Sequence, residues 1–154
     1  MLAILSVLAM IALDQLVKYW TITVVKPVIT IPVIQNVFHF TYVENRGAAF
    51  SILQGRKLFF VLITAVVLLM ILYAFQKGLI VRATGKWALL MVAGGAIGNL
   101  IDRILRGFVV DVFDFCLIHF PVFNVADIFV VCGGFLFAFY ILFQHPSSEK
   151  TDDN

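Results

Sequence analysis

Long apolar stretches dominate the chain, and they occupy residues 2–20, 58–75, 87–103 and 122–143. Each is close to the roughly twenty residues that an α-helix needs to cross the hydrocarbon core of a bilayer. Because the connections are short, the pattern predicts an antiparallel bundle of four membrane-spanning helices. The second stretch has no charged residue and is predicted to be scaffold. The third carries Gly94 and Gly98, at the spacing that lets a neighbouring helix approach closely.

A different pattern fills residues 21–57, between the first two spans. Two runs of β-branched and aromatic residues, Val28–Ile34 and Val37–Val43, are separated by Gln35 and Asn36. This arrangement predicts a β-hairpin, and Pro32 confines its own strand to the edge of the sheet. We therefore expect a small extramembrane β-cradle between spans one and two, in a protein that is otherwise mainly α-helical. The polar tail at 145–154 is predicted to be disordered.

Composition supports a membrane protein. Of the 154 residues, 62% are hydrophobic and only 13% are charged, which is more apolar surface than one small soluble core could bury. The net charge of +2 and the absence of a basic run argue against nucleic-acid binding. Cys116 and Cys132 lack metal-ligand spacing, so we expect free, buried thiols with no metal and no cofactor. The chain 1–154 is interpreted as one membrane domain.

Carboxylates within such an apolar sequence need a physical reason, because an unpartnered buried charge costs several kcal/mol or more. Asp111 and Asp127 flank a turn at Pro121, so their carboxyl groups could meet. Two like charges at close range cannot both ionise, and one pKa rises. The pair could then act as general base and general acid together, which is the chemistry of an aspartyl protease. Asp114 lies at an odd offset from Asp111, and in an extended segment it would face away.

Polar residues from several spans converge if the helices alternate in direction. The end of span one, the end of span three and the start of span four then lie at the same membrane face as the hairpin. Asp14 and Lys18 could form only a local ion pair or act near a substrate, and Asn45 to Gly47 suit a turn or a binding loop equally. Asp102 and Arg103 could be a helix-end cluster or could face a neighbouring helix. The residues collected at this face are Asp14, Lys18, Asn45, Asn99, Asp102, Arg103, Asp111, Asn124 and Asp127.

Five short motifs in this order resemble those of the bacterial lipoprotein signal peptidases, also called signal peptidase II. Together they cover nearly the whole chain, and their order and spacing make the resemblance specific. The motifs are Asp14-Gln15 with Lys18, Asn45-Arg46-Gly47-Ala48-Ala49-Phe50, Gly98-Asn99-Leu100-Ile101-Asp102-Arg103, Val109-Val110-Asp111-Val112-Phe113-Asp114-Phe115 and Phe123-Asn124-Val125-Ala126-Asp127.

The resemblance implies a monomeric aspartic endopeptidase of the bacterial inner membrane, with its active site towards the extracytoplasmic face and membrane lipids around it. Such an enzyme removes the signal peptide of a prolipoprotein just before a cysteine that carries diacylglycerol. Asp111 and Asp127 would be catalytic. Residues implied to line or order the site are Asp14, Lys18, Asn45, Gly47, Asn99, Asp102, Arg103 and Asn124.

One alternative of another class is a small transporter or proton pathway, in which membrane-embedded carboxylates would act as relays. That function predicts charges spread through the depth of the bilayer. The sequence instead places them at one face and leaves the second span uncharged.

Overall fold

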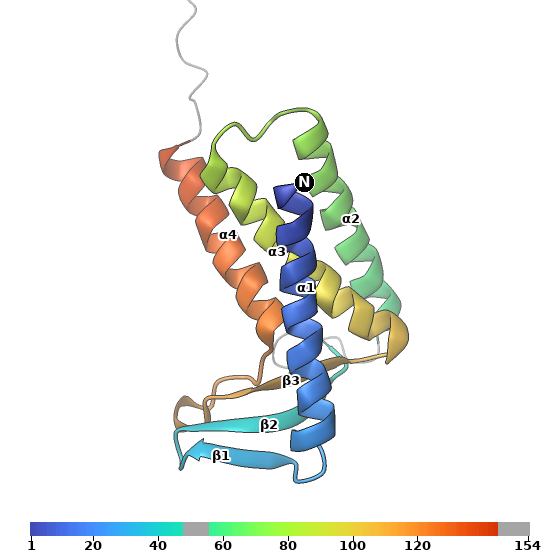
Figure 1. The fold of residues 1–154 in the computed structure, drawn as a ribbon, viewed down its shortest axis with the longest axis vertical. Helices are drawn as coiled ribbons and strands as arrows, with labels where there is room; N and C mark the ends of the chain where they lie inside the picture. The colour runs from blue at the N-terminus through green and yellow to red at the C-terminus, as the bar shows by residue number, and fades with distance from the viewer. Residues whose placement is uncertain (48–55, 145–154) are drawn as a thin grey trace, which may run out of the picture.

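The computed structural model describes residues 1–47 and 56–144, and four long helices form its bundle (Figure 1). All four are long and apolar enough to cross a membrane, which confirms the predicted fold class. The first helix continues without a break into a π-helical turn, η1. The predicted polar tail, 145–154, lies outside the described residues. The elements are α1 (Leu2–Trp20), η1 (Thr21–Val25), α2 (Lys57–Gln76), α3 (Ala83–Leu105) and α4 (Val125–Phe143).

Two helix starts differ from the prediction by three residues or more, and the other boundaries agree within two residues. The third helix begins at Ala83 rather than Trp87, because the hydropathy pattern marks only its apolar part and the first turn contains the polar residues Thr84 and Lys86. The fourth begins at Val125 rather than Val122, because Asn124 is an N-cap and Phe123 is extended and pairs with Phe113. The apolar run therefore includes three residues that precede the helix.

A three-stranded antiparallel sheet lies at one end of the bundle, in the order β1 (Thr30–Ile34), β2 (Phe38–Asn45) and β3 (Val109–Asp114) (Figure 1). The predicted hairpin is β1 with β2, and Pro32 is in an edge strand as expected. The sheet is not confined to residues 21–57, however. Its third strand comes from the segment between α3 and α4, and this strand carries Asp111 opposite Val43.

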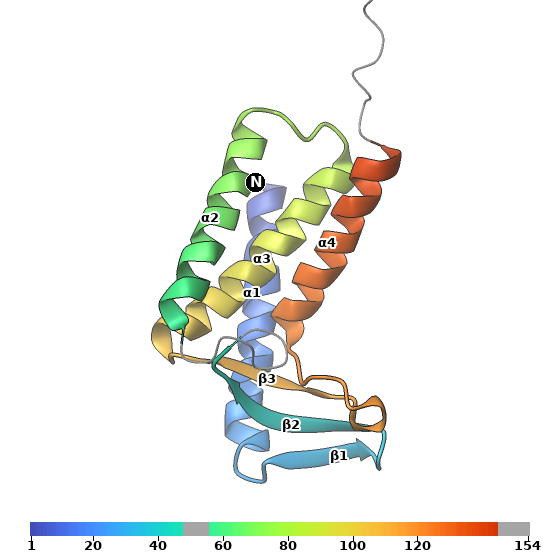
Figure 2. The ribbon, with the colours of Figure 1, turned by 180° about the vertical axis from the view of Figure 1, so that it is seen from behind.

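Helix α3 lies between α2 and α4 when the molecule is seen from behind (Figure 2). Its glycines explain how closely the neighbouring helices approach. Methyl groups on Gly94 and Gly98 would lie 3.1 Å from Cβ of Met10 and 2.6 Å from Oδ2 of Asp14, both in α1. One on Gly95, which was not part of the prediction, would meet the backbone oxygen of Ala126 in α4. The predicted close approach along this face of α3 is therefore present. It brings the polar residues of α1, α3 and α4 together.

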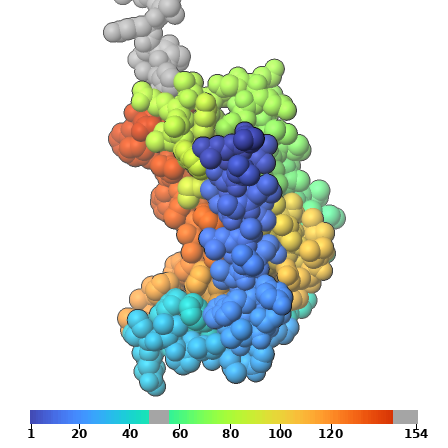
Figure 3. All heavy atoms as spheres, in the orientation of Figure 1, coloured from blue at the N-terminus to red at the C-terminus, as the bar shows by residue number. Residues whose placement is uncertain are grey.

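The outer surface of the bundle is apolar, as a membrane span requires. Along α1, which runs up the face seen in Figure 3, Leu5, Leu8 and Leu16 are all more than half exposed. The end of the bundle away from the sheet has a packed core of its own. That core is formed by Ile71, Ile80, Leu89, Ala93 and Tyr140.

Candidate active site

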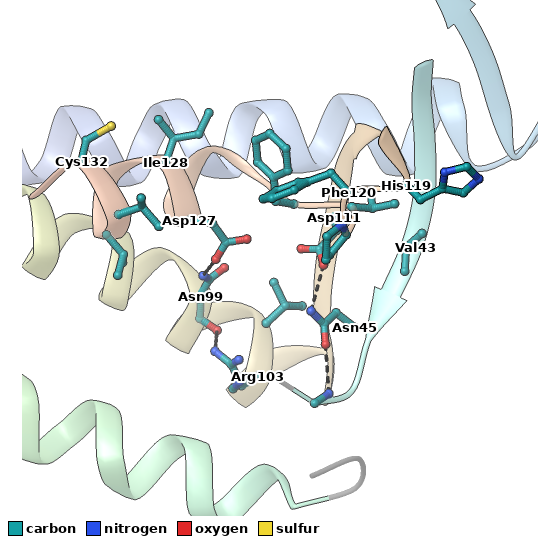
Figure 4. A pocket seen from close by; sticks show the side chains of 17 residues that line it. Val43, Asn45, Asn99, Arg103, Asp111, His119, Phe120, Asp127, Ile128 and Cys132 are labelled. Carbon is teal, nitrogen blue, oxygen red and sulfur yellow. Dashed lines mark hydrogen bonds between the residues drawn. The ribbon is translucent and has the colours of Figure 1, made fainter. Parts of the chain in front are cut away.

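A cavity of about 840 Å³ opens where the sheet meets the ends of α3 and α4 (Figure 4). Most of its polar lining comes from β2, α3, β3 and α4, and most of its apolar lining comes from the segment before α4 and from α4 itself. The carboxyl groups of Asp111 and Asp127 face each other across it, and we call these two residues the dyad. The lining residues are Val43, Asn45, Gly47, Asn99, Arg103, Val109, Asp111, His119, Phe120, Pro121, Val122, Phe123, Asp127, Ile128, Val130, Val131 and Cys132.

Asp111 is almost fully buried in β3 and is held by two carboxamides. The side chain of Asn45, at the end of β2, donates to its Oδ2 at 2.9 Å. The side chain of Asn124 donates to its Oδ1 at 2.6 Å. The side chain of Asn45 is fixed in turn, because its Oδ1 accepts the backbone N–H of Gly47 at 3.0 Å. Both carboxylate oxygens of Asp111 therefore have a donor from a side chain whose position is set by the fold.

Asp127 is positioned by the first turn of α4. The side chain of Asn124 accepts the N–H of Asp127 at 2.9 Å, and Oδ2 of Asp127 accepts the N–H of Asn124 at 3.1 Å. This reciprocal arrangement is a capping box, which satisfies donors that every helix N-terminus leaves free. The remaining oxygen, Oδ1, accepts from the side chain of Asn99 at 2.8 Å. A helix-capping interaction thus also fixes the direction of a candidate catalytic carboxyl group.

Asn99 and Asn124 connect the two halves of the dyad. The side-chain oxygen of Asn99 accepts from the amide of Asn124 at 3.2 Å, while each residue donates to one member of the dyad. Both asparagines are buried. A continuous chain of hydrogen bonds therefore runs from Asp127 through Asn99 and Asn124 to Asp111.

An ionic network with a fully buried centre lies behind this chain. Nζ of Lys18 contacts Oδ2 of Asp14 at 2.9 Å, Oδ2 of Asp102 at 3.2 Å and Oδ1 of Asn99 at 2.9 Å. Arg106 also pairs with Asp102. The three central members, Asp14, Lys18 and Asp102, are fully buried, whereas Arg106 is partly exposed. None of these three residues lines the cavity. The ion pair of Asp14 and Lys18 is not only local, because Lys18 also contacts Asp102 in α3.

The two carboxylates of this network hold the backbone segments that carry the dyad. Oδ2 of Asp102 accepts the N–H of Val110 at 3.0 Å, next to Asp111 in β3. Oδ1 of Asp14 accepts the N–H of Ala126 at 3.0 Å, next to Asp127 in α4. The network therefore sets the relative position of the two segments and orders the site from behind.

The environment of Asp111 favours its protonated form. Burial, followed by the nearby negative charge of Asp127, raises the pKa of Asp111 to about 7. Hydrogen bonds from Asn45 and Asn124 act in the opposite direction, because they stabilise the ionised carboxylate. A carboxyl group with this pKa can hold or release a proton at neutral pH, which general acid–base chemistry requires.

The other predicted residues fall into two groups. Asn45, Gly47, Asn99 and Arg103 line the cavity with the dyad, whereas Asp14, Lys18, Asp102 and Asn124 lie behind it. Asp114 is separate, as its odd offset predicted, because its carboxylate accepts from Thr41 at 2.8 Å instead.

One sequence expectation needs correction, and one residue needs to be added. The thiols are free but not buried, since Cys116 is half-buried and Cys132 is exposed and lines the cavity. Sequence reasoning did not assign a role to Gln15, whose amide donates to Asp14 at 3.1 Å and to the carbonyl of Gly98 at 3.2 Å. The available signals were its place beside Asp14 and its presence in the first of the five motifs. No group of three or more potential metal-ligating side chains occurs among residues 1–47 and 56–144.

Comparison with known proteins identifies the relatives of this chain. The family model described as signal peptidase (SPase) II matches residues 6–143. A lipoprotein signal peptidase of Clostridioides difficile (strain 630) is 46% identical over 149 residues, which are 97% of this chain and 100% of the relative. A lipoprotein signal peptidase of Caldanaerobacter subterraneus subsp. tengcongensis is also 46% identical, over 93% of this chain and 97% of the relative.

Solved structures agree with the sequence relatives. A protein described as "Bacterial membrane enzyme structure by the in meso method at 2.3 A resolution" superposes with a TM-score of 0.84 and 33% sequence identity. The match covers 99% of this chain and 93% of the other chain. A second structure, described in the same words at 1.9 Å resolution, gives a TM-score of 0.81 and 34% identity, over 92% of this chain and 93% of the other. The chain, a multi-pass membrane protein, therefore belongs to the signal peptidase II family.

Proposed function

We propose that this chain is an aspartic endopeptidase that removes the signal peptide from prolipoproteins, cleaving just before a cysteine that carries diacylglycerol. The observation that carries the proposal is the dyad, in which Asp111 and Asp127 face each other across the cavity (Figure 4). Membership of the signal peptidase II family supports the peptidase activity. The lipoprotein signal peptidases among its relatives support this class of substrate.

The dyad holds one proton between its two carboxyl groups at neutral pH, because burial and mutual repulsion oppose the doubly ionised state. The ionised carboxylate takes a proton from a water molecule, whose oxygen attacks the scissile carbonyl. The protonated partner donates a hydrogen bond to that carbonyl and stabilises the charge that develops on its oxygen. The tetrahedral intermediate then collapses as the leaving nitrogen takes up a proton from the dyad. No covalent enzyme intermediate forms.

Arg103 is the most available donor for the developing negative charge. It lines the cavity, and its one hydrogen bond in the described part of the chain is a long contact of 3.5 Å to the carbonyl of Asn99. Asn124 is less available, since its amide already serves Asn99 and Asp111. Arg103 therefore binds the scissile or a neighbouring carbonyl of the substrate, while the asparagines orient the dyad.

The apolar part of the cavity suits a lipid-modified substrate. Phe120, Val122, Ile128 and Val131 line it, and Ile128 and Val131 also face outwards from α4. A substrate anchored in the bilayer can reach the dyad along this side without leaving the apolar phase. We further propose that the enzyme works as a monomer in the bacterial cytoplasmic (inner) membrane, with the sheet and the dyad on the extracytoplasmic side.

A transporter or proton pathway is not favoured. Its relays would have to continue through the bilayer, but Asp14, Lys18 and Asp102 form one closed network at the sheet end. At the other end, the space between α2, α3 and α4 is filled by the apolar core around Tyr140. The family membership also points to a peptidase.

The direct test is cleavage of a defined precursor by the purified full-length chain in detergent micelles. Two versions of one prolipoprotein peptide would be compared, with and without diacylglyceryl on the cysteine. We expect the modified precursor alone to be cleaved, with mass spectrometry locating the new carboxyl end directly before the cysteine. Equal cleavage of both versions would refute the proposed substrate class, and cleavage of neither would refute the proposed activity.

A further inference from the structure

Arg103 is half-buried in the wall of the cavity, yet no carboxylate among the described residues lies within ion-pairing distance of it. The contrast with two other arginines is informative. Arg106, one turn further along, pairs with Asp102, and Arg46 pairs with Glu44 at 2.8 Å. No short ion pair therefore fixes the direction of the guanidinium group of Arg103, although the negative charges of Asp127, Asp111 and Asp102 attract it from further away.

Besides the long hydrogen bond to the carbonyl of Asn99, the guanidinium group of Arg103 contacts the ring of Phe60. The guanidinium carbon lies 5.0 Å from the centre of this ring, within the range of a cation–π interaction. Phe60 is half-buried in the first turn of α2. That turn is also tied to α3, because Nζ of Lys57 donates to the carbonyl of Ile104 at 3.3 Å. The ring is thus held in place by a helix that contributes no residue to the cavity lining.

We propose that Phe60 is a positioning residue that holds Arg103 towards the substrate through its aromatic face. This role rests on the proposed function, in which Arg103 donates to a substrate carbonyl. The physical advantage is specific. A carboxylate would occupy the guanidinium N–H donors in a bidentate contact, whereas an aromatic face attracts the cation and leaves those donors free. The second span, predicted to be scaffold only, then takes part in the site.

The test compares substitutions at two adjacent phenylalanines. Phe60→Leu removes the ring and keeps an apolar side chain, while Phe60→Tyr keeps the aromatic face. Phe59→Leu is the matched control, because Phe59 is in the same turn of α2, packs edge-on against the Phe60 ring at 5.4 Å and makes no cation–π contact among the described residues; it therefore perturbs the packing of this turn without removing the ring that faces Arg103. We expect Phe60→Leu to lower kcat/KM about threefold to thirtyfold, with Phe60→Tyr and Phe59→Leu close to wild type.

A double-mutant cycle separates positioning from a general structural effect. In an Arg103→Gln background, Phe60→Leu should cause no further loss of kcat/KM, since the interaction that it removes is already absent. An equal loss in both backgrounds, or an equal loss from Phe59→Leu, would overturn the proposed role.

A second readout does not depend on catalysis. The side-chain N–H resonance of Arg103, assigned by its loss in Arg103→Lys, should be shifted by the ring current of Phe60. It should move in Phe60→Leu and stay in place in Phe59→Leu. If this resonance moves in Phe60→Leu but kcat/KM does not change, the contact between Phe60 and Arg103 is supported and its role in the reaction is refuted. If the wild-type chain cleaves no lipidated precursor, the proposed function fails, and an unmoved resonance would refute the contact independently.

Discussion

Replacing Lys18 by methionine removes the only cation that contacts both Asp14 and Asp102 among the described residues. Methionine has a similar length and is apolar, so the change isolates the charge and its hydrogen bonds. All three residues are completely buried. Without Lys18, Asp102 keeps only the charge of Arg106 and Asp14 has no cation, so the network acquires a net negative charge at buried carboxylates. The folded state must then carry that charge or bind a proton.

Removing one partner of a buried ion pair typically costs about 3–5 kcal/mol of stability. The remaining donors reduce the cost here. Asp14 keeps the N–H of Ala126 and the amide of Gln15, and Asp102 keeps the N–H of Val110. We therefore expect Lys18→Met to lower the free energy of unfolding by about 3 kcal/mol, the lower end of that range. Activity should fall as well, because Asn99 loses a donor on the side opposite to Asp127.

The assay is reversible unfolding of the purified variants in detergent micelles at constant pH. Lys26→Met is the control, because Lys26 lies 3.8 Å from Glu44 on the surface and its removal should leave stability close to wild type. Adding Asp14→Asn to Lys18→Met removes the excess charge and should recover part of the loss. A Lys18→Met variant within roughly 1 kcal/mol of wild type, or a double variant less stable than the single one, would refute the reasoning.

Three further predictions follow from the same geometry. The alkaline limb of the pH profile of kcat/KM should lie at about pH 7, where the dyad loses its shared proton. Asn45→Ala should move this limb to higher pH, because a donor that stabilises the ionised carboxylate of Asp111 is lost, and an unchanged limb would contradict this. Gly95→Ala should destabilise the protein by about 1–3 kcal/mol through a clash with α4, while Gly134→Ala, which meets nothing within 4 Å, should not, as unfolding would show. In intact cells that express a chain without Cys116 and Cys132, an impermeant thiol reagent should label Gln35→Cys and not Lys77→Cys. The reverse pattern would place the sheet in the cytoplasm.

Much of this fold could be predicted because a bilayer imposes strong rules on sequence. Long apolar runs mark the spans, and their alternation in direction correctly brings Asp14, Asn99 and Asn124 to the same end as the hairpin. The odd offset between Asp111 and Asp114 correctly separated their partners, because side chains alternate along a strand.

The remaining features depend on contacts between distant segments, which sequence patterns do not encode. Nothing in the hydropathy of residues 109–114 indicates that this strand pairs with β2. Helical spacing gave the face on which Asp14 and Lys18 lie but not their depth, so sequence alone could not separate residues that line the cavity from those behind it. The exposure of Cys132 was missed because apolar and thiol side chains are found outside as well as inside in a membrane protein.

The dyad is the central claim, and turnover of a diacylglyceryl-modified precursor by purified variants tests it most directly. Asparagine keeps the shape of aspartate but cannot take up or release the proton, so Asp111→Asn and Asp127→Asn should each abolish cleavage in a folded protein. The double variant should be no worse than either single one, because residues that act as a unit are not additive. Asp114→Asn, which changes a carboxylate bound to Thr41, should keep most activity. Substantial turnover by Asp111→Asn or Asp127→Asn, or inactivity of Asp114→Asn with Asp111→Asn active, would contradict the assignment.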